Sequence, residues 1–191
     1  MLDTSKMSTG RRIAFVIVLS IIFVLVAVPF KVLNLIPGIT EIRPVDCLNM
    51  LFGVMFGIYG ALGCAIGNII ADILGGTLTI SSWAGFVSNF VGTYLAYILW
   101  YGIIKERPRI RNLKQVAAFT LVSAAIGIVI AGIVTFGVEL SYPEVDGISL
   151  FVQIFLNTLG FSVILGMPLV IMLEEVYGIK GCVPKKYLEE K

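Results

Sequence analysis

Long apolar runs separated by short polar stretches are the dominant pattern along the chain. A helix that crosses the hydrocarbon core of a bilayer needs roughly 20 mostly apolar residues. Four runs reach this length and predict transmembrane helices at residues 12–33, 83–103, 115–138 and 148–176. A further apolar block, residues 45–75, is too long for a single untilted span.

The block at residues 45–75 is predicted to form two shorter helices, 45–59 and 61–75, that meet at Gly60. Further glycines flank this position on both sides, and glycine suits the backbone of a tight turn. The alternative is one long, kinked helix. The divided arrangement predicts a compact bundle of about six transmembrane helices.

The composition agrees with this pattern. Apolar residues make up 58% of the 191-residue chain and charged residues only 14%, and the mean hydropathy is +1.00. A soluble domain of this length rarely has so apolar a composition. We therefore expect an all-α integral membrane protein that spans residues 1–191 as a single membrane domain in the lipid bilayer.

The positions of Lys and Arg predict the orientation, because short loops rich in these residues stay in the cytoplasm. Twelve of the 14 basic residues fall into three clusters on one side: Lys6, Arg11 and Arg12; Lys105, Arg107, Arg109, Arg111 and Lys114; and Lys180, Lys185, Lys186 and Lys191. Both termini are therefore expected in the cytoplasm, which requires an even number of spans. The expected location is the cell (cytoplasmic) membrane, crossed several times.

Polar side chains inside the predicted spans gather toward the outer half of the bilayer. Such groups are costly in hydrocarbon and by default indicate a functional site. The candidate binding residues inside the spans are Asp46, Asn49, Asn68, Asp72, Asn89, Gln153 and Asn157, with Tyr97 continuing the face of Asn89. For any one of them, bridging between helices is an equally good explanation, so the prediction depends on their convergence.

Two predicted outer loops add further candidates. The loop after the first helix carries Glu41 and Arg43, and the loop at residues 75–82 offers hydroxyl groups that include Thr77 and Thr79. Trp83 follows directly, although a tryptophan here also suits a headgroup anchor. The inner halves of the spans carry few polar groups, so the pattern predicts a cup that opens to the outside and is closed below.

Enzymatic classes find little support in the sequence. The chain has no histidine, which excludes His-dependent zinc sites, His-ligated haem and Ser-His dyads. It also lacks a Walker-type phosphate loop, so any ATP must be used by another polypeptide. The three cysteines lack metal-ligand spacing. We expect no enzymatic activity, no metal and no cofactor, and the net charge of +2 gives no reason to expect nucleic acid.

The region of residues 43–101 resembles a known family. Arg-Pro-Val-Asp at 43–46, Gly-Asn-Ile-Ile-Ala-Asp-Ile-Leu-Gly-Gly-Thr-Leu at 67–78 and Gly-Phe-Val-Ser-Asn-Phe at 85–90 are similar to substrate-binding S components of energy-coupling factor (ECF) transporters. The resemblance implies a small six-helix protein that captures a vitamin or related micronutrient at the outer face, with the loops after helices one and three as gates. It further implies a membrane coupling subunit and two cytoplasmic ATPase subunits as partners.

The resemblance has one departure. Many members with a shared coupling module carry Ala-x-x-x-Ala on helix one, whereas here Ala14 is followed four residues later by Val18. The coupling module is thus shared, dedicated or absent. Two other hypotheses stay open: a stand-alone secondary transporter of a small molecule, and a membrane scaffold that transports nothing.

The substrate expected from the residues is a flat ring compound. Trp83, Tyr94 and Tyr97 are available to stack on a ring, and Arg43 is available to meet an anionic group. A heteroaromatic vitamin, or a nucleobase-like compound such as a queuosine precursor, fits these groups.

Overall fold

The computed structural model describes residues 7–32, 42–179 and 182, and these residues are mostly helical with no strand among them. The main helices are α1 (Thr9–Val32), α2 (Cys47–Leu74), α3 (Ser82–Leu99), α4 (Leu113–Ser141), α5 (Gly147–Phe161) and α6 (Met167–Ile171). A 3-10 turn, Pro44–Asp46, precedes α2. Three π-helical turns extend the later helices: Trp100–Ile104 after α3, Ser162–Gly166 between α5 and α6, and Met172–Val176 after α6.

Five segments of the described chain are long and apolar enough to cross a bilayer: Thr9–Lys31, Pro44–Leu74, Ser82–Ile104, Leu113–Ser141 and Gly147–Val176. The all-α prediction is confirmed. The prediction of six separate spans differs from this result, because the block that was divided in two is one continuous helical segment with a sharp break inside it. The cytoplasmic location of the termini remains a prediction.

The break inside α2 lies at Gly57, three residues before the predicted position. Gly57 has φ 55° and ψ −129°, a conformation that side chains other than glycine rarely adopt. Cys64 Sγ lies 3.9 Å from the carbonyl oxygen of Leu48, although 16 residues of straight helix would separate them by about 24 Å. The two limbs of α2 therefore fold back on each other as a hairpin.

Gly60, where the turn was predicted, instead allows the two limbs of the hairpin to pack closely. A Cβ atom at Gly60 would lie within 3 Å of the backbone of Phe52 on the other limb. Gly63 is similarly close to Leu19 of α1, and Gly53 to Ala96 of α3. Small residues let helix backbones approach closely in a membrane bundle, so these glycines fix the hairpin between its neighbours.

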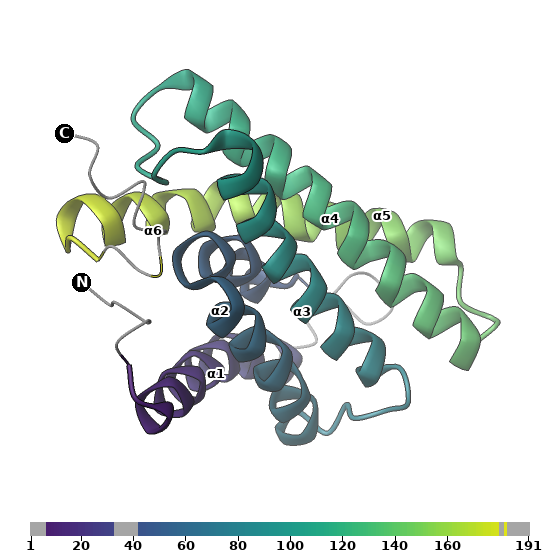
Figure 1. Cartoon of the computed structure of the whole chain (residues 1–191). Coiled ribbons are helices and arrows are strands. Elements are labelled where there is room, and N and C mark those ends of the chain that lie inside the picture. Colours follow the sequence, from purple (N-terminus) through teal and green to yellow (C-terminus); the bar gives the residue numbers. More distant parts are fainter. Residues whose placement is uncertain (1–6, 33–41, 180–181, 183–191) are drawn as a thin grey trace.

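Helices that follow one another in the chain pack side by side. Figure 1 shows α1 against the α2 hairpin, α3 beside the hairpin, and the long helices α4 and α5 running together beyond α3. The core around the hairpin includes fully buried Phe23, Met50, Trp100 and Phe119.

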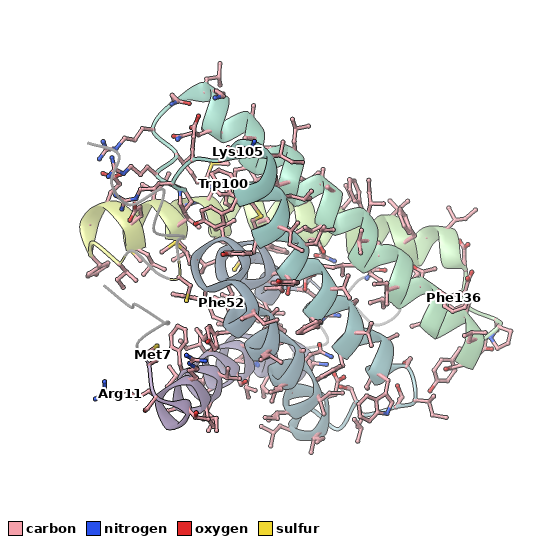
Figure 2. All side chains as sticks on the ribbon, in the orientation of Figure 1. Met7, Arg11, Phe52, Trp100, Lys105 and Phe136 are labelled. Atoms are coloured by element: carbon pink, nitrogen blue, oxygen red, sulfur yellow. The ribbon has the colours of Figure 1, made fainter. Side chains whose placement is uncertain are left out.

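The bundle has two chemically different ends. One, here called the basic end, holds the start of α1, the loop at residues 105–112 and the turn Met172–Val176. The other, here called the pocket end, holds the C-terminal end of α1, residues 42–46 and the loops at 75–81 and 142–146. Figure 2 shows Arg11 and Lys105 toward the basic end, Phe136 toward the pocket end and Phe52 between them.

Candidate functional site

A cavity of about 360 Å³ lies at the pocket end. Its walls come from residues far apart in the sequence: the end of α1, the 3-10 turn before α2, the second limb of α2, the loop at 75–82, and α3, α4 and α5. A volume of this size lies within the range of small-molecule sites. The cavity therefore accommodates a compact ligand of a few rings.

Asp72, on the second limb of α2, is held by three side chains. Lys31 at the end of α1 forms an ion pair with its carboxylate. Asn68 Nδ2 donates to Asp72 Oδ2 over 3.4 Å from one helical turn away, and Thr77 Oγ1 donates to Oδ1 over 3.4 Å. Lys31 Nζ also reaches Thr77 Oγ1 at 3.2 Å. This cluster ties α1, α2 and the following loop together.

Arg43 and Asp46 lie at the other side of the cavity, where Pro44 begins the 3-10 turn. Arg43 Nε lies 3.6 Å from Asp46 Oδ1, and Arg43 Nη2 lies 3.5 Å from Asn68 Oδ1. The backbone N–H of Arg43 donates to Asn157 Oδ1 on α5 over 3.4 Å. Arg43 thus joins the turn before α2 to both α2 and α5.

The first turns of α3 supply amide and hydroxyl groups. Ser88 Oγ and Asn89 Nδ2 both donate to the carbonyl oxygen of Gly85, over 2.9 and 2.7 Å. Asn89 Oδ1 is buried and has no hydrogen-bond partner among the described residues. Gly85 also allows the close approach of Asn68, because a Cβ atom there would lie 2.7 Å from Asn68 Nδ2.

The opposite wall is aliphatic. Ile130, Val134 and Val138 of α4, and Leu150 and Ile154 of α5, face the same cavity. A polar wall against an aliphatic wall suits a flat molecule that forms hydrogen bonds along its edge and packs through its ring faces. Among the described residues that line the cavity, the charged side chains are two cations, Lys31 and Arg43, and two anions, Asp46 and Asp72, so their formal charges cancel.

Nine of the 13 residues predicted to bind a ligand line this cavity: Arg43, Asp46, Asn68, Asp72, Thr77, Thr79, Asn89, Gln153 and Asn157. The predicted relation between Asn68 and Asp72, one turn apart on one face, is present. Glu41 lies outside the described residues. Asn49, Trp83 and Tyr97 are described but do not line the cavity.

The three residues that do not line the cavity have other surroundings. Asn49 is fully buried, and its Oδ1 accepts a hydrogen bond from Thr93 Oγ1 over 2.9 Å, so it bridges α2 and α3. Trp83 is 66% exposed and lies edge-on to Phe86. Tyr97 packs against Gly57 at the hairpin turn, in a second cavity of about 190 Å³.

The aromatic residues of α3 stack on one another instead of facing the polar cavity. The ring centroids of Tyr94 and Tyr97 are 6.1 Å apart with nearly parallel planes, and Phe90 continues the stack. None of the described aromatic residues lines the polar cavity. Any ring held there is packed by aliphatic side chains, so the predicted stacking on Trp83, Tyr94 and Tyr97 is not available in this arrangement.

Sequence reasoning missed part of the lining. The residues not anticipated are Lys31, Gly85, Ser88, Ile130, Val134, Val138, Leu150 and Ile154. Ser81 and Ser82 also line the cavity and belong to the loop whose hydroxyl groups were expected there. The spacing of Ile130, Val134 and Val138 at four-residue intervals was visible, but it does not distinguish a cavity wall from a lipid-facing stripe. Lys31 was separated from the basic clusters, and its isolation was the available signal.

The described side chains of the site offer hydrogen bonding and charge. No group of three or more Asp, Glu, Cys or His side chains able to hold a metal ion occurs in the part of the chain that the structure describes.

Comparison with models of protein families shows which family the chain belongs to. The model of the QueT transporter family matches residues 13–175, which is most of the chain. The chain belongs to this family. QueT transporters are ECF-type S components for a queuosine precursor, so the resemblance noted in the sequence is confirmed. The match also includes every described residue that lines the cavity. No curated protein and no solved structure matches the chain.

Membership in the QueT family agrees with the five long apolar segments, and together they indicate a multi-pass membrane protein of a transporter family. The family implies a small-molecule substrate and partners from an ECF module in general.

Proposed function

We propose that this chain is the substrate-binding subunit of an ECF-type importer and that it captures a queuosine precursor, a 7-deazaguanine base, in the cavity at the pocket end. The observation that supports this most directly is the cavity itself, within a QueT family member: about 360 Å³, polar on one wall and aliphatic on the other. The base is flat and has hydrogen-bonding groups along its edge, which matches the two walls.

The orientation and energy source belong to the same proposal. Seven of the described basic residues, Arg11, Arg12, Lys105, Arg107, Arg109, Arg111 and Lys114, belong to the segments at the basic end. Because basic segments stay in the cytoplasm, the cavity at the opposite end opens to the outside of the cell. The chain lacks a phosphate-binding loop, so a membrane coupling subunit and two cytoplasmic ATPases supply the energy. The loops around the cavity act as its gates.

A binding experiment on the purified protein tests the substrate and its site. The protein is placed in lipid nanodiscs and titrated with 7-deazaguanine bases by calorimetry. Val134→Trp introduces a large side chain at the cavity wall and should weaken binding at least tenfold. Phe136→Trp is the matched control, because Phe136 is 64% exposed on the same helix and does not line the cavity. Equal binding by both variants would show that the base binds elsewhere.

An uptake experiment separates the importer from the stand-alone carrier. Vesicles containing this chain alone should take up no base, and vesicles that also contain the coupling subunit and ATPases should do so only with ATP. Uptake by the chain alone would favour secondary transport. A folded protein that binds no base at all would favour the scaffold hypothesis.

A further inference from the structure

The two carboxylates at the cavity differ in how completely their oxygens are used. Asp72 has Lys31, Asn68 and Thr77 as side-chain partners. Asp46 has one, the guanidinium of Arg43 at 3.6 Å from Nε to Oδ1, and its carboxylate accepts no hydrogen bond from the side chain of any other described residue. Most of the acceptor capacity of the Asp72 carboxylate is therefore used, whereas most of that of Asp46 is not.

The carboxylate of Asp46 is also deeply buried. The side chain of Asp46 is only 5% exposed, yet the residue lines the cavity. An ionised carboxylate accepts about four hydrogen bonds, and leaving it without donors when it is buried is costly. Because the described residues around it provide only Arg43 as a side-chain partner, the Asp46 carboxylate has oxygens left to accept hydrogen bonds from a molecule in the cavity.

We propose that Asp46 is the specificity-determining residue of the site, which accepts two parallel hydrogen bonds from the ring N–H and the exocyclic amino group of a 2-aminopyrimidinone edge. This inference rests on the proposed capture of a 7-deazaguanine base. The two donors on that edge match the two oxygens of a carboxylate in the same way as the paired N–H groups of a guanidinium.

The neighbours of Asp46 suit the rest of that edge. Beside the ring N–H of such a base is a carbonyl oxygen that requires a donor, and Arg43 is the cation adjacent to Asp46. The Arg43 and Asp46 charges balance, so a neutral base enters without burying a net charge. Asp72 has a different role, because its partners already join α1 to the loop after α2.

The first test changes the ligand and leaves the protein intact. Wild-type protein in nanodiscs is titrated with 7-deazaguanine and with 7-deazahypoxanthine, which lacks only the exocyclic amino group. Loss of one donor to a buried carboxylate should weaken binding on the order of 100-fold. Equal affinity for the two bases would overturn the assignment of Asp46 but leave capture of the base intact. If neither base binds, the proposed function fails, and this inference fails with it.

The second test changes the carboxylate. Asp46→Asn keeps the shape but places an amide N–H against the donors of the base, so the preference for 7-deazaguanine should fall to less than about threefold. Asp72→Asn is the matched control: it should weaken both bases by a similar factor and retain the preference. A preference that survives in Asp46→Asn, or is lost in Asp72→Asn, would contradict the inference. If Asp46→Asn does not fold, the ligand comparison with wild-type protein decides the question.

Discussion

The two ends of the bundle use the same kinds of charged side chain in different surroundings. At the pocket end, Lys31, Arg43, Asp46 and Asp72 surround a cavity. At the basic end, Arg107 forms an ion pair with Glu174, and both side chains are nearly inaccessible at 8% and 2% exposure. The comparison shows that an ion pair either lines a cavity or joins two segments, depending on whether packing leaves space beside it.

Several further ion pairs and hydrogen bonds join the segments of the basic end. Arg109 Nε lies 3.6 Å from Glu174 Oε1, and Arg111 Nε donates to Glu175 Oε1 over 2.9 Å. Trp100 Nε1 donates to the carbonyl oxygen of Glu106 over 2.7 Å. These contacts join the loop at residues 105–112 to the end of the last helical segment.

The largest expected effect is on the buried ion pair of the basic end. Glu174→Gln leaves the charge of Arg107 buried with a weaker partner, which should lower the free energy of unfolding by about 3–5 kcal/mol. Thermal unfolding in nanodiscs measures the loss. Ligand affinity of the folded fraction should stay within about twofold. Glu175→Gln is the control, because Arg111 is 59% exposed and solvent screens such a pair, so its loss of stability should be much smaller. Equal losses of stability in Glu174→Gln and Glu175→Gln would show that burial does not increase the contribution of the ion pair.

The next effect is on the cavity. Gly85→Ala places a Cβ atom 2.7 Å from Asn68 Nδ2, so Asn68 must shift and lose its alignment with Asp72. Affinity for the base should fall by a factor on the order of 10 to 100, as expected when a binding group is misplaced, with only a small change in melting temperature. Gly160→Ala on α5 is the control, because a Cβ atom there has no neighbour within 4 Å. Unchanged affinity in Gly85→Ala would place the ligand away from Asn68.

A smaller effect is expected when Asp72, the carboxylate with three side-chain partners at the pocket end, loses its cation. Lys31→Met removes the cation from Asp72 and leaves Asn68 and Thr77 as its partners. The free energy of unfolding should fall by about 1.5–3 kcal/mol, the usual contribution of a hydrogen bond to a charged group. Lys114→Met is the comparison, since Lys114 is 74% exposed. A larger loss from Lys114→Met in thermal unfolding would contradict the ranking.

The smallest effect depends on pH. Hydrogen bonds from Lys114 and Gln115 hold the pKa of Glu106 below its ordinary value of 4.5. Folding therefore favours the ionised form of Glu106. The stability that ionised Glu106 contributes is present above its pKa in the unfolded chain and is lost as the pH falls through its pKa in the folded protein. Glu106→Gln should cost less than about 1 kcal/mol at pH 7. The difference in melting temperature between wild type and variant should shrink as the pH is lowered below 4.5, and a difference that grows would reverse the sign.

Much of the site was predictable because helical periodicity is local. Asn68 and Asp72 are four residues apart, which places them on one face of any helix, and the structure keeps them together. The same reasoning failed for Tyr97. It shares a face with Asn89 in sequence terms, but the hairpin turn at Gly57 packs against its ring and the tyrosines stack along α3.

The amino-acid sequence by itself determined the apolar segments, their approximate ends and the polar residues that they carry, because span length and side-chain periodicity depend only on neighbouring residues. Tertiary structure alone decided that the α2 block turns at Gly57, and that α4 and α5 form an aliphatic wall. It also decided that Asp72 has three side-chain partners and Asp46 only one. Lys31 and Asp72 are 41 residues apart, and Arg43 and Asn157 are 114 apart. Contacts over such separations depend on how the whole bundle packs, which no local pattern specifies.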